Sequence, residues 1–165
     1  MGGRIEPFVE QTLQEWMPLQ VNRDKTRTVR LYQPGASLNF LGYTFRYDRD
    51  PYDREGRYRH LTVREPSLQR VRDRLKERTG APQCFTPIRP RIERINRRLR
   101  GWQGYFSRGH LSDVYRDVDS YTQRRRSTHL HRRSQRAYKK PAGVTWWDHL
   151  QQLGWTPLQK RLVKR

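Results

Sequence analysis

Apolar side chains recur at steps of three and four residues in several stretches of the chain, a spacing typical of amphipathic helices. Residues 5–17 show this spacing, with Ile5, Phe8, Val9, Leu13 and Trp16 on one helical face. Residues 88–106 show it most clearly, with Ile92, Ile95, Leu99, Trp102 and Phe106. The pattern predicts a short N-terminal helix, which Pro18 should end, and a longer central helix.

Two further helices are predicted on either side of the central one. Residues 67–79 form the first, opened by Pro66 and followed by Gly80 at its C-terminal end. Residues 111–138 form the second, with Ser112 or Asp113 as its cap. The apolar stripe of this helix ends at Tyr121, so we expect its distal part either to fray or to be stabilised by phosphate. A short terminal helix is predicted within residues 144–162.

Alternating apolar and polar positions predict a small β element between these helices. Residues 27–32 and 39–46 alternate on either side of the turn signal Pro34-Gly35, which predicts a β-hairpin over residues 27–46. Residues 47–56 read as a loop and residues 58–63 as a third strand. The fold class is therefore mainly α with a small β element, in three parts: 1–64 with the N-terminal helix and hairpin, 65–140 as a basic three-helix bundle, and 141–165 as a Trp-rich C-terminal segment.

Positive charge dominates the 165 residues, with a formal net charge of +20 carried by 30 Arg and 6 Lys against 16 acidic residues. Residues 89–140 alone carry +12. Arginine pairs bidentately with phosphate and stacks on bases, so this excess favours a nucleic-acid partner. Low hydrophobicity with high charge is typical of disorder, but an aromatic fraction of 12% argues for packed cores. We expect no membrane partner, because no apolar run approaches the ~20 residues of a span.

The remaining chemistry of the chain predicts neither a cofactor nor a metal site. His129 and His131 lack the Cys or carboxylate partners that a metal would need. Asp113, Asp117 and Asp119 are explained by the dipole at a helix N-terminus. The single cysteine, Cys84, forms no internal disulfide, and no secretory signal is recognised, which together predict a reducing, bacterial-type cytoplasm.

The predicted RNA-binding surface lies on the basic faces of residues 88–138 and just beyond them. Trp102 and Phe106 fall on the apolar stripe and should pack in the core, whereas Tyr105 lies off it. If about eight phosphates are neutralised, the log–log salt slope should be near −7. The predicted RNA-binding residues are Arg91, Arg94, Arg97, Arg98, Arg100, Tyr105, Arg108, Arg124, Arg125, Arg126, His129, Arg132, Arg133, Arg136, Lys139 and Lys140.

Four motifs, read in order, resemble those of one protein family. Residues 19–26 (Leu-Gln-Val-Asn-Arg-Asp-Lys-Thr) and 40–45 (Phe-Leu-Gly-Tyr-Thr-Phe) resemble the last two palm motifs of group II intron reverse transcriptases. Residues 95–106 (Ile-Asn-Arg-Arg-Leu-Arg-Gly-Trp-Gln-Gly-Tyr-Phe) are similar to the motif of that family's maturase-specific domain, also called the thumb or X domain. Residues 146–155 resemble its C-terminal segment.

The resemblance implies a role and also marks a departure from the family. The family's thumb is a three-helix bundle that grips template–primer duplex and intron RNA, supporting reverse transcription and splicing. Lys25 matches the palm lysine near the incoming nucleotide. No Tyr-x-Asp-Asp sequence occurs here, and the family's catalytic acids would lie upstream of Met1. The resemblance therefore predicts that this chain alone is not an enzyme.

Three hypotheses for function follow. The first is an RNA-binding protein that holds structured, group II intron-like RNA through phosphates and aids its folding or splicing. The second is the C-terminal part of a split reverse transcriptase, whose catalytic palm is a separate polypeptide. The third is a structural protein of a ribonucleoprotein. RNA is preferred to DNA by the resemblance alone.

Overall fold

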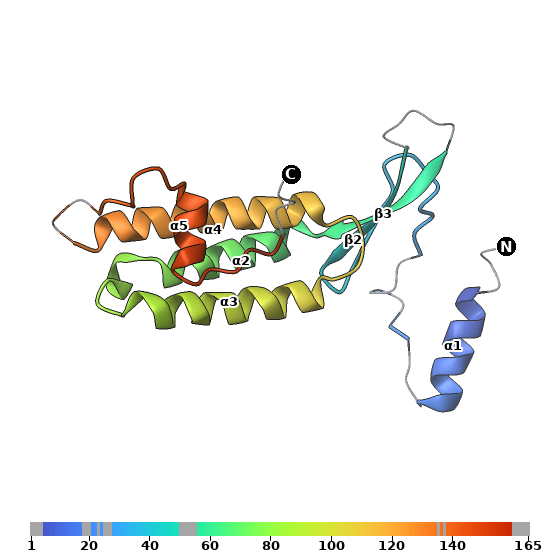
Figure 1. The fold of residues 1–165 in the computed structure, drawn as a ribbon. Coiled ribbons are helices and arrows are strands. Elements are labelled where there is room, and N and C mark those ends of the chain that lie inside the picture. Colours follow the sequence, from blue (N-terminus) through green and yellow to red (C-terminus); the bar gives the residue numbers. More distant parts are fainter. Residues whose placement is uncertain are drawn as a thin grey trace.

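The computed structural model describes residues 5–17, 21–22, 24, 28–49, 56–134, 136 and 138–159. In Figure 1 the long helices form one end of the molecule, a small sheet lies at the other end, and the N-terminal helix lies apart from both. The predicted class, mainly α with a small β element, is confirmed. Among the helices in the described ranges, none is long and apolar enough to cross a membrane.

Helix α1 (Ile5–Trp16) forms where the apolar spacing predicted it. Its apolar side chains do not enter a core: Phe8 is 68% exposed and Trp16 83% exposed. Pro18, the expected stop, lies outside the described residues. The predicted helix is therefore confirmed, but its apolar face is exposed.

The β element is a three-stranded antiparallel sheet of β1 (Ser37–Phe40), β2 (Tyr43–Arg49) and β3 (Arg57–Val63), in that order. The predicted hairpin over 27–46 is wrong. The segment 39–46 is not one strand, because the chain reverses at Leu41 and Gly42, which have φ of 48° and 81°. Two consecutive left-handed residues make the tight turn that matches the twist of paired strands. Phe40 and Tyr43 flank this turn as register partners.

The segments on both sides of this hairpin also differ from the prediction. Residues 28–30 have no regular secondary structure and residues 31–32 form a turn, so the strand predicted over 27–32 is absent from its described part. Pro34-Gly35 does form a turn, but that turn precedes β1 instead of joining two strands. The predicted loop begins too early, because residues 47–49 pair with β3 as the end of β2. The third strand is confirmed.

Three helices form the bundle: α2 (Glu65–Arg78), α3 (Ile88–Tyr105) and α4 (Ser112–Arg132), with a short 3₁₀ turn, η2 (Ala81–Gln83), between the first two. Helix α4 ends at Arg132, six residues before the predicted end. Neither Ser112 nor Asp113 is its N-cap. Leu111 occupies that position without a side-chain cap bond, and both polar residues lie in the first turn.

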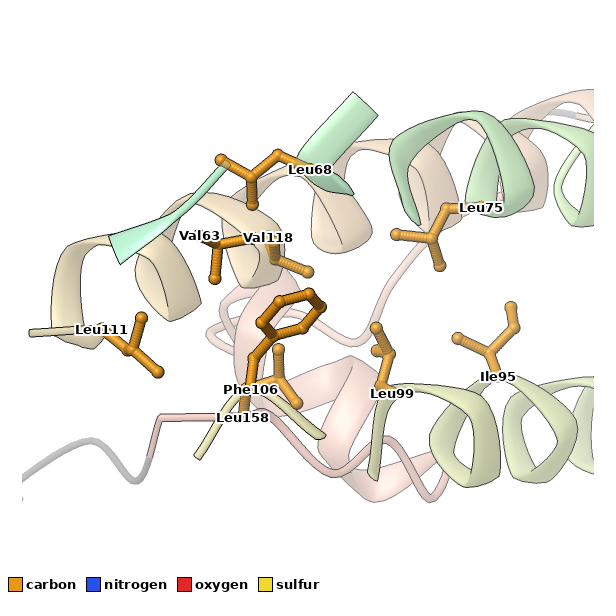
Figure 2. Packing of buried hydrophobic residues seen from close by; sticks show 9 residues of the cluster. All are labelled: Val63, Leu68, Leu75, Ile95, Leu99, Phe106, Leu111, Val118 and Leu158. Atoms are coloured by element: carbon orange, nitrogen blue, oxygen red, sulfur yellow. The ribbon is translucent and has the colours of Figure 1, made fainter. Parts of the chain in front are cut away.

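The main core lies where the bundle meets the sheet. Leu75 of α2 faces Ile95 and Leu99 of α3, while Phe106 fills the space beside Val118 of α4 (Figure 2). Each buried aliphatic or aromatic side chain of this size stabilises the fold by about 1.5–3 kcal/mol. Trp102 packs against the same cluster, so the prediction that Trp102 and Phe106 contribute to the core is confirmed.

A second core covers the distal half of α4. Helix α5 (Trp146–Gln152) lies across α3 and α4 (Figure 1), and it brings Leu150 and the following Trp155 against Ile92 and Leu130. The expectation of a helix that is polar all round beyond Tyr121 is therefore wrong. Its buried row continues at steps of four, but through polar residues that hydrophobic periodicity does not register: Thr122 and Arg126, followed by Leu130.

The tip of the β1–β2 hairpin is fastened to the end of α3 by two tyrosines. The hydroxyl of Tyr105 donates to the carbonyl of Leu41 at 3.0 Å, and the hydroxyl of Tyr43 donates to the carbonyl of Tyr105 at 3.0 Å. A Cβ at Gly42 would lie 3.1 Å from the Phe106 ring. The sheet is thereby held against the bundle at one end of the space between α2 and α3.

Candidate nucleic-acid interface

The predicted RNA-binding residues fall into three groups by exposure. The exposed group contains Arg94, Arg97, Arg98, Arg100, Tyr105, Arg108, Arg124, Arg132, Arg136 and Lys139. Arg125, Arg133 and Lys140 are half-buried. Arg91, Arg126 and His129 are buried. The first two groups remain available to a ligand, whereas the third group makes its contacts inside the protein.

Arg91 and His129 bind each other and the backbone between α2 and α3. The Arg91 guanidinium contacts Nε2 of His129 and donates to the carbonyl of Thr86 at 3.2 Å. The other ring nitrogen, Nδ1, lies 3.2 Å from the carbonyl of Thr79, which assigns the proton to that atom. Burial, and then the nearby Arg91 charge, lower the pKa of His129, so the ring is neutral. This pair holds α3 to α4 and presents no charge to solvent.

Arg126 lies within the second core. Its guanidinium is 5.4 Å from the centroid of the Trp155 ring and donates to Oδ1 of Asn96 at 3.4 Å. Burial lowers the pKa of Arg126 to about 9, an effect that the carboxylate of Asp119 opposes. A buried cation beside an aromatic face packs the C-terminal segment against α4, which is a structural role.

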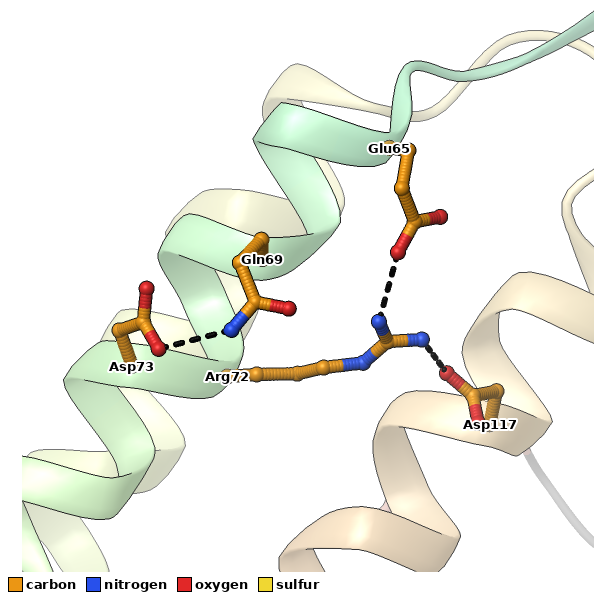
Figure 3. Close-up of polar contacts among 5 residues, drawn as sticks. All are labelled: Glu65, Gln69, Arg72, Asp73 and Asp117. Atoms are coloured by element: carbon orange, nitrogen blue, oxygen red, sulfur yellow. Dashed lines mark hydrogen bonds and ion pairs between the residues drawn. The ribbon is translucent and has the colours of Figure 1, made fainter.

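The three aspartates of α4 have separate roles. Asp113 lies in the first turn, where the predicted dipole effect applies. Asp117 accepts from Arg72 of α2 at 2.6 Å, and Arg72 also donates to Glu65 (Figure 3). The carboxylate of Asp119 is buried and accepts the backbone N–H groups of the C-terminal segment. The sequence could not distinguish these roles, because two of them depend on residues distant in the chain.

The predicted RNA-binding residues do not include a row of arginines on α2. Arg70, Arg74 and Arg78 recur at steps of four, so they lie on one side of the helix. Glu65 and Arg72 lie on the opposite side, where Arg72 bridges to Asp117 of α4 (Figure 3). Asp73 lies between the two sides and accepts from Gln69. Residues 46–88 together have a net charge of only +4, and this sum hid the row because it combines both sides of the helix. The four-residue spacing of the arginines was the signal that could have shown it.

The arginine row borders a groove of about 450 Å³ between α2 and α3. Arg98 of α3 lines the groove as well, and the hairpin tip at Leu41 and Gly42 closes one end. The floor is apolar, with Leu75, Ile95, Leu99 and Phe106. No carboxylate lines the groove in the part of the chain that the structure describes. The interface thus offers four guanidinium groups around an apolar floor, and further exposed arginines lie along α3.

Within the described ranges, no group of three or more His, Cys, Asp or Glu side chains is placed to hold a metal ion. Burial of His129 separates it from His131, which is exposed and lies edge-on to Trp146 with ring centroids 5.2 Å apart. Cys84 has a free thiol and is half-buried.

The fold and the interface define a basic three-helix bundle that follows a small antiparallel sheet and carries an arginine-lined groove. The profile of the group II intron maturase-specific domain family matches residues 68–151, from the first buried leucine of α2 to α5. The match covers just over half of the chain, and the protein belongs to this family. No curated protein sequence matches the chain.

Proposed function

We propose that this protein binds structured RNA of the group II intron type and aids its folding or splicing. The observation that carries the proposal is the groove between α2 and α3, which is lined by four arginines and by no carboxylate among the described residues. Such an arrangement repels cations and attracts a polyanion. Membership of the maturase-specific domain family supports RNA as that polyanion, and intron RNA as its class.

Phosphate groups are the ligands that the exposed arginines fit best. Each guanidinium offers a planar fork of N–H donors that pairs with two phosphate oxygens. Arg98 of α3 lines the groove, Arg94 and Arg97 are exposed elsewhere on the same helix, and Arg124 is exposed on α4. Contacts of this kind position the protein without reading sequence, so affinity should depend steeply on salt.

The proposal also states that this chain binds RNA without catalysing polymerisation. The matched family domain is the maturase-specific domain and not the catalytic palm. A polymerase needs a carboxylate cluster to hold two metal ions around the reacting phosphate. The sequence contains no Tyr-x-Asp-Asp motif, so we assign the chain the role of a holder of RNA.

Fluorescence anisotropy with a labelled, folded group II intron RNA tests this function. The test variant replaces Arg94, Arg97 and Arg98 with Gln. The matched control replaces Arg30, Arg59 and Arg64, which are exposed outside the interface, and so removes the same charge. The test variant should lose affinity and lower the salt slope by about 2–3, since each phosphate contact contributes about 0.9. Equal losses in both variants would show attraction by net charge alone and would contradict the proposed interface.

A second function, partnership with a separate reverse-transcriptase palm, is favoured by helix α1. Ile5, Phe8 and Trp16 are all exposed, although they occupy one face of an amphipathic helix. Exposed apolar faces of this kind are covered by partner proteins. Mixing the chain with a palm polypeptide that lacks its own thumb should then restore polymerase activity, and Phe8→Ser should reduce the restoration. Activity that is absent on mixing would exclude this partnership.

A further inference from the structure

The groove between α2 and α3 has two chemically different parts. Its rim carries Arg70, Arg74 and Arg78 from α2 and Arg98 from α3. Its floor is formed by aliphatic and aromatic side chains of the main core. A ligand that satisfies both parts must be anionic at its edge and flat or apolar at its centre. The accessible apolar part of the groove comes from the half-buried Val71 and Trp102 and from the exposed Tyr105. Solvated phosphate alone would leave this surface exposed to water.

Aromatic side chains stand at the end of the groove nearest the sheet. Tyr105 is 58% exposed and is held by its hydroxyl bond to Leu41, so its ring is presented in one orientation. Trp102 lines the groove beside it, although its indole Nε1 is itself buried. Two aromatic side chains at one end of the groove suit a flat heterocycle that stacks against them.

The size of the groove limits the ligand. A volume of about 450 Å³ lies in the range of pockets that hold small ligands, about 300–1,000 Å³. Paired bases stay stacked inside an A-form duplex, which presents to a protein its phosphates and its shallow minor groove. Unpaired bases can instead leave the stack and lie on aromatic side chains or guanidinium planes. The apolar floor therefore fits an unpaired base better than it fits a duplex surface.

We propose that the groove between α2 and α3 binds one unpaired RNA nucleotide, its base on the apolar and aromatic floor and its flanking phosphates on the arginine rim. This inference rests on the proposed RNA-binding function and makes it specific. The exposed arginines of α3 outside the groove hold the adjoining helical RNA, and the groove selects helices interrupted by a bulge or loop. This selection depends on Val71, Trp102 and Tyr105, which line the groove. The stacked bases of a duplex do not enter this space, whereas an unpaired base does.

Two model RNAs test the proposal. One is a fully paired RNA hairpin, and the other is the same hairpin with a single bulged 2-aminopurine. The protein should bind the bulged hairpin about tenfold more tightly, in line with the stacking of one base on aromatic side chains. The fluorescence of the 2-aminopurine should change on binding, because its stacking partners change.

Val71→Trp provides the matched perturbation, because Val71 is half-buried and lines the groove, so that a larger side chain fills it. The control, Gln69→Trp, adds the same side chain on the opposite, exposed side of α2. Val71→Trp should abolish the preference for the bulge, so that both hairpins bind with equal affinity, while Gln69→Trp should retain the preference. Circular dichroism melting checks that both variants fold.

A wild-type measurement keeps the test decisive if Val71→Trp does not fold. A 4-thiouridine placed at the bulge should crosslink to the peptide that contains Trp102 and Tyr105. Equal affinity for both hairpins, or crosslinks confined to other peptides, would overturn the nucleotide site and leave the proposed RNA binding intact. Failure to bind either hairpin would overturn both.

Discussion

The carboxylate of Asp119, in the middle of α4, accepts the backbone N–H of Leu158 at 2.9 Å. Its second oxygen accepts the N–H of Gln159, also at 2.9 Å. One buried side chain therefore fixes a chain segment 39 residues away and inserts Leu158 into the main core. The C-terminal segment is joined to the bundle by this polar contact as well as by the packing of Trp155.

Replacement of Asp119 should weaken the whole bundle. Asp119→Ala leaves two N–H groups without an acceptor, and each unsatisfied buried donor costs about 1–3 kcal/mol. We expect the free energy of unfolding in urea to fall by about 2–4 kcal/mol. Asp119→Asn keeps one acceptor oxygen and should lose less. The control, Asp113→Asn, changes an exposed carboxylate and should stay within about 0.5 kcal/mol of the wild type. A similar loss in both positions would contradict the role of Asp119.

His129 should make stability depend on pH below neutrality. Its pKa is lowered by burial and by Arg91, so between that pKa and 6.5 the unfolded chain binds more protons than the folded one. Stability then rises with pH across this window and is lost as pH falls through it. His129→Gln should flatten the dependence between pH 5 and pH 7.5, measured by urea unfolding. The control, His131→Gln, changes an exposed ring and should leave the pH dependence of stability as in the wild type. His60, whose pKa is also lowered by burial, contributes equally to the pH dependence of all three proteins. Identical profiles for all three proteins would refute the assignment.

The parts of the fold that follow hydrophobic spacing could be predicted from the sequence. A regular spacing of apolar residues is present within each of these elements, namely α1, α2, α3 and β3. The β1–β2 turn shows none, because Leu41 reads as a strand residue and only the paired backbone reveals its left-handed conformation. The distal part of α4 was misread for a related reason, since Thr122 and Arg126 are buried although both are polar, and the partners of Arg126, Asn96 and Trp155, are distant in the chain.

The candidate interface could be predicted only in part. The basic residues of α3 and α4 are evident from charge, but charge does not distinguish Arg94, which is exposed, from Arg91, which is buried. The α2 row was missed because segment charge averages over both sides of a helix. Periodicity applied to arginines as well as to apolar residues would have found Arg70, Arg74 and Arg78.

Gly42→Ala should destabilise the fold more than Gly35→Ala. Gly42→Ala forces a side chain into the left-handed region, at about 1–2 kcal/mol, and its Cβ meets Phe106 and Ser67 at 3.1 Å. Gly35→Ala has the same kind of backbone, φ 76°, but its Cβ meets nothing within 4 Å. The melting temperature should therefore fall further for Gly42→Ala, and the difference between the two variants measures the packing of the hairpin tip. An equal fall in melting temperature for the two variants would contradict the packing of the hairpin tip against Phe106.

Arg91 and Arg94 separate a structural arginine from an RNA-binding one, although they lie three residues apart on α3. Arg91→Gln removes the contacts with His129 and with the carbonyl of Thr86, and should lower the free energy of unfolding by about 1–3 kcal/mol. Its salt slope for RNA binding should not change, because the side chain does not reach solvent. Arg94→Gln should keep the stability and lower the slope by about 0.9, the contribution of one phosphate contact. The two variants have the same charge, so any difference between them arises from position. A lowered slope in Arg91→Gln would place that arginine at the interface instead, and would contradict the buried pair with His129.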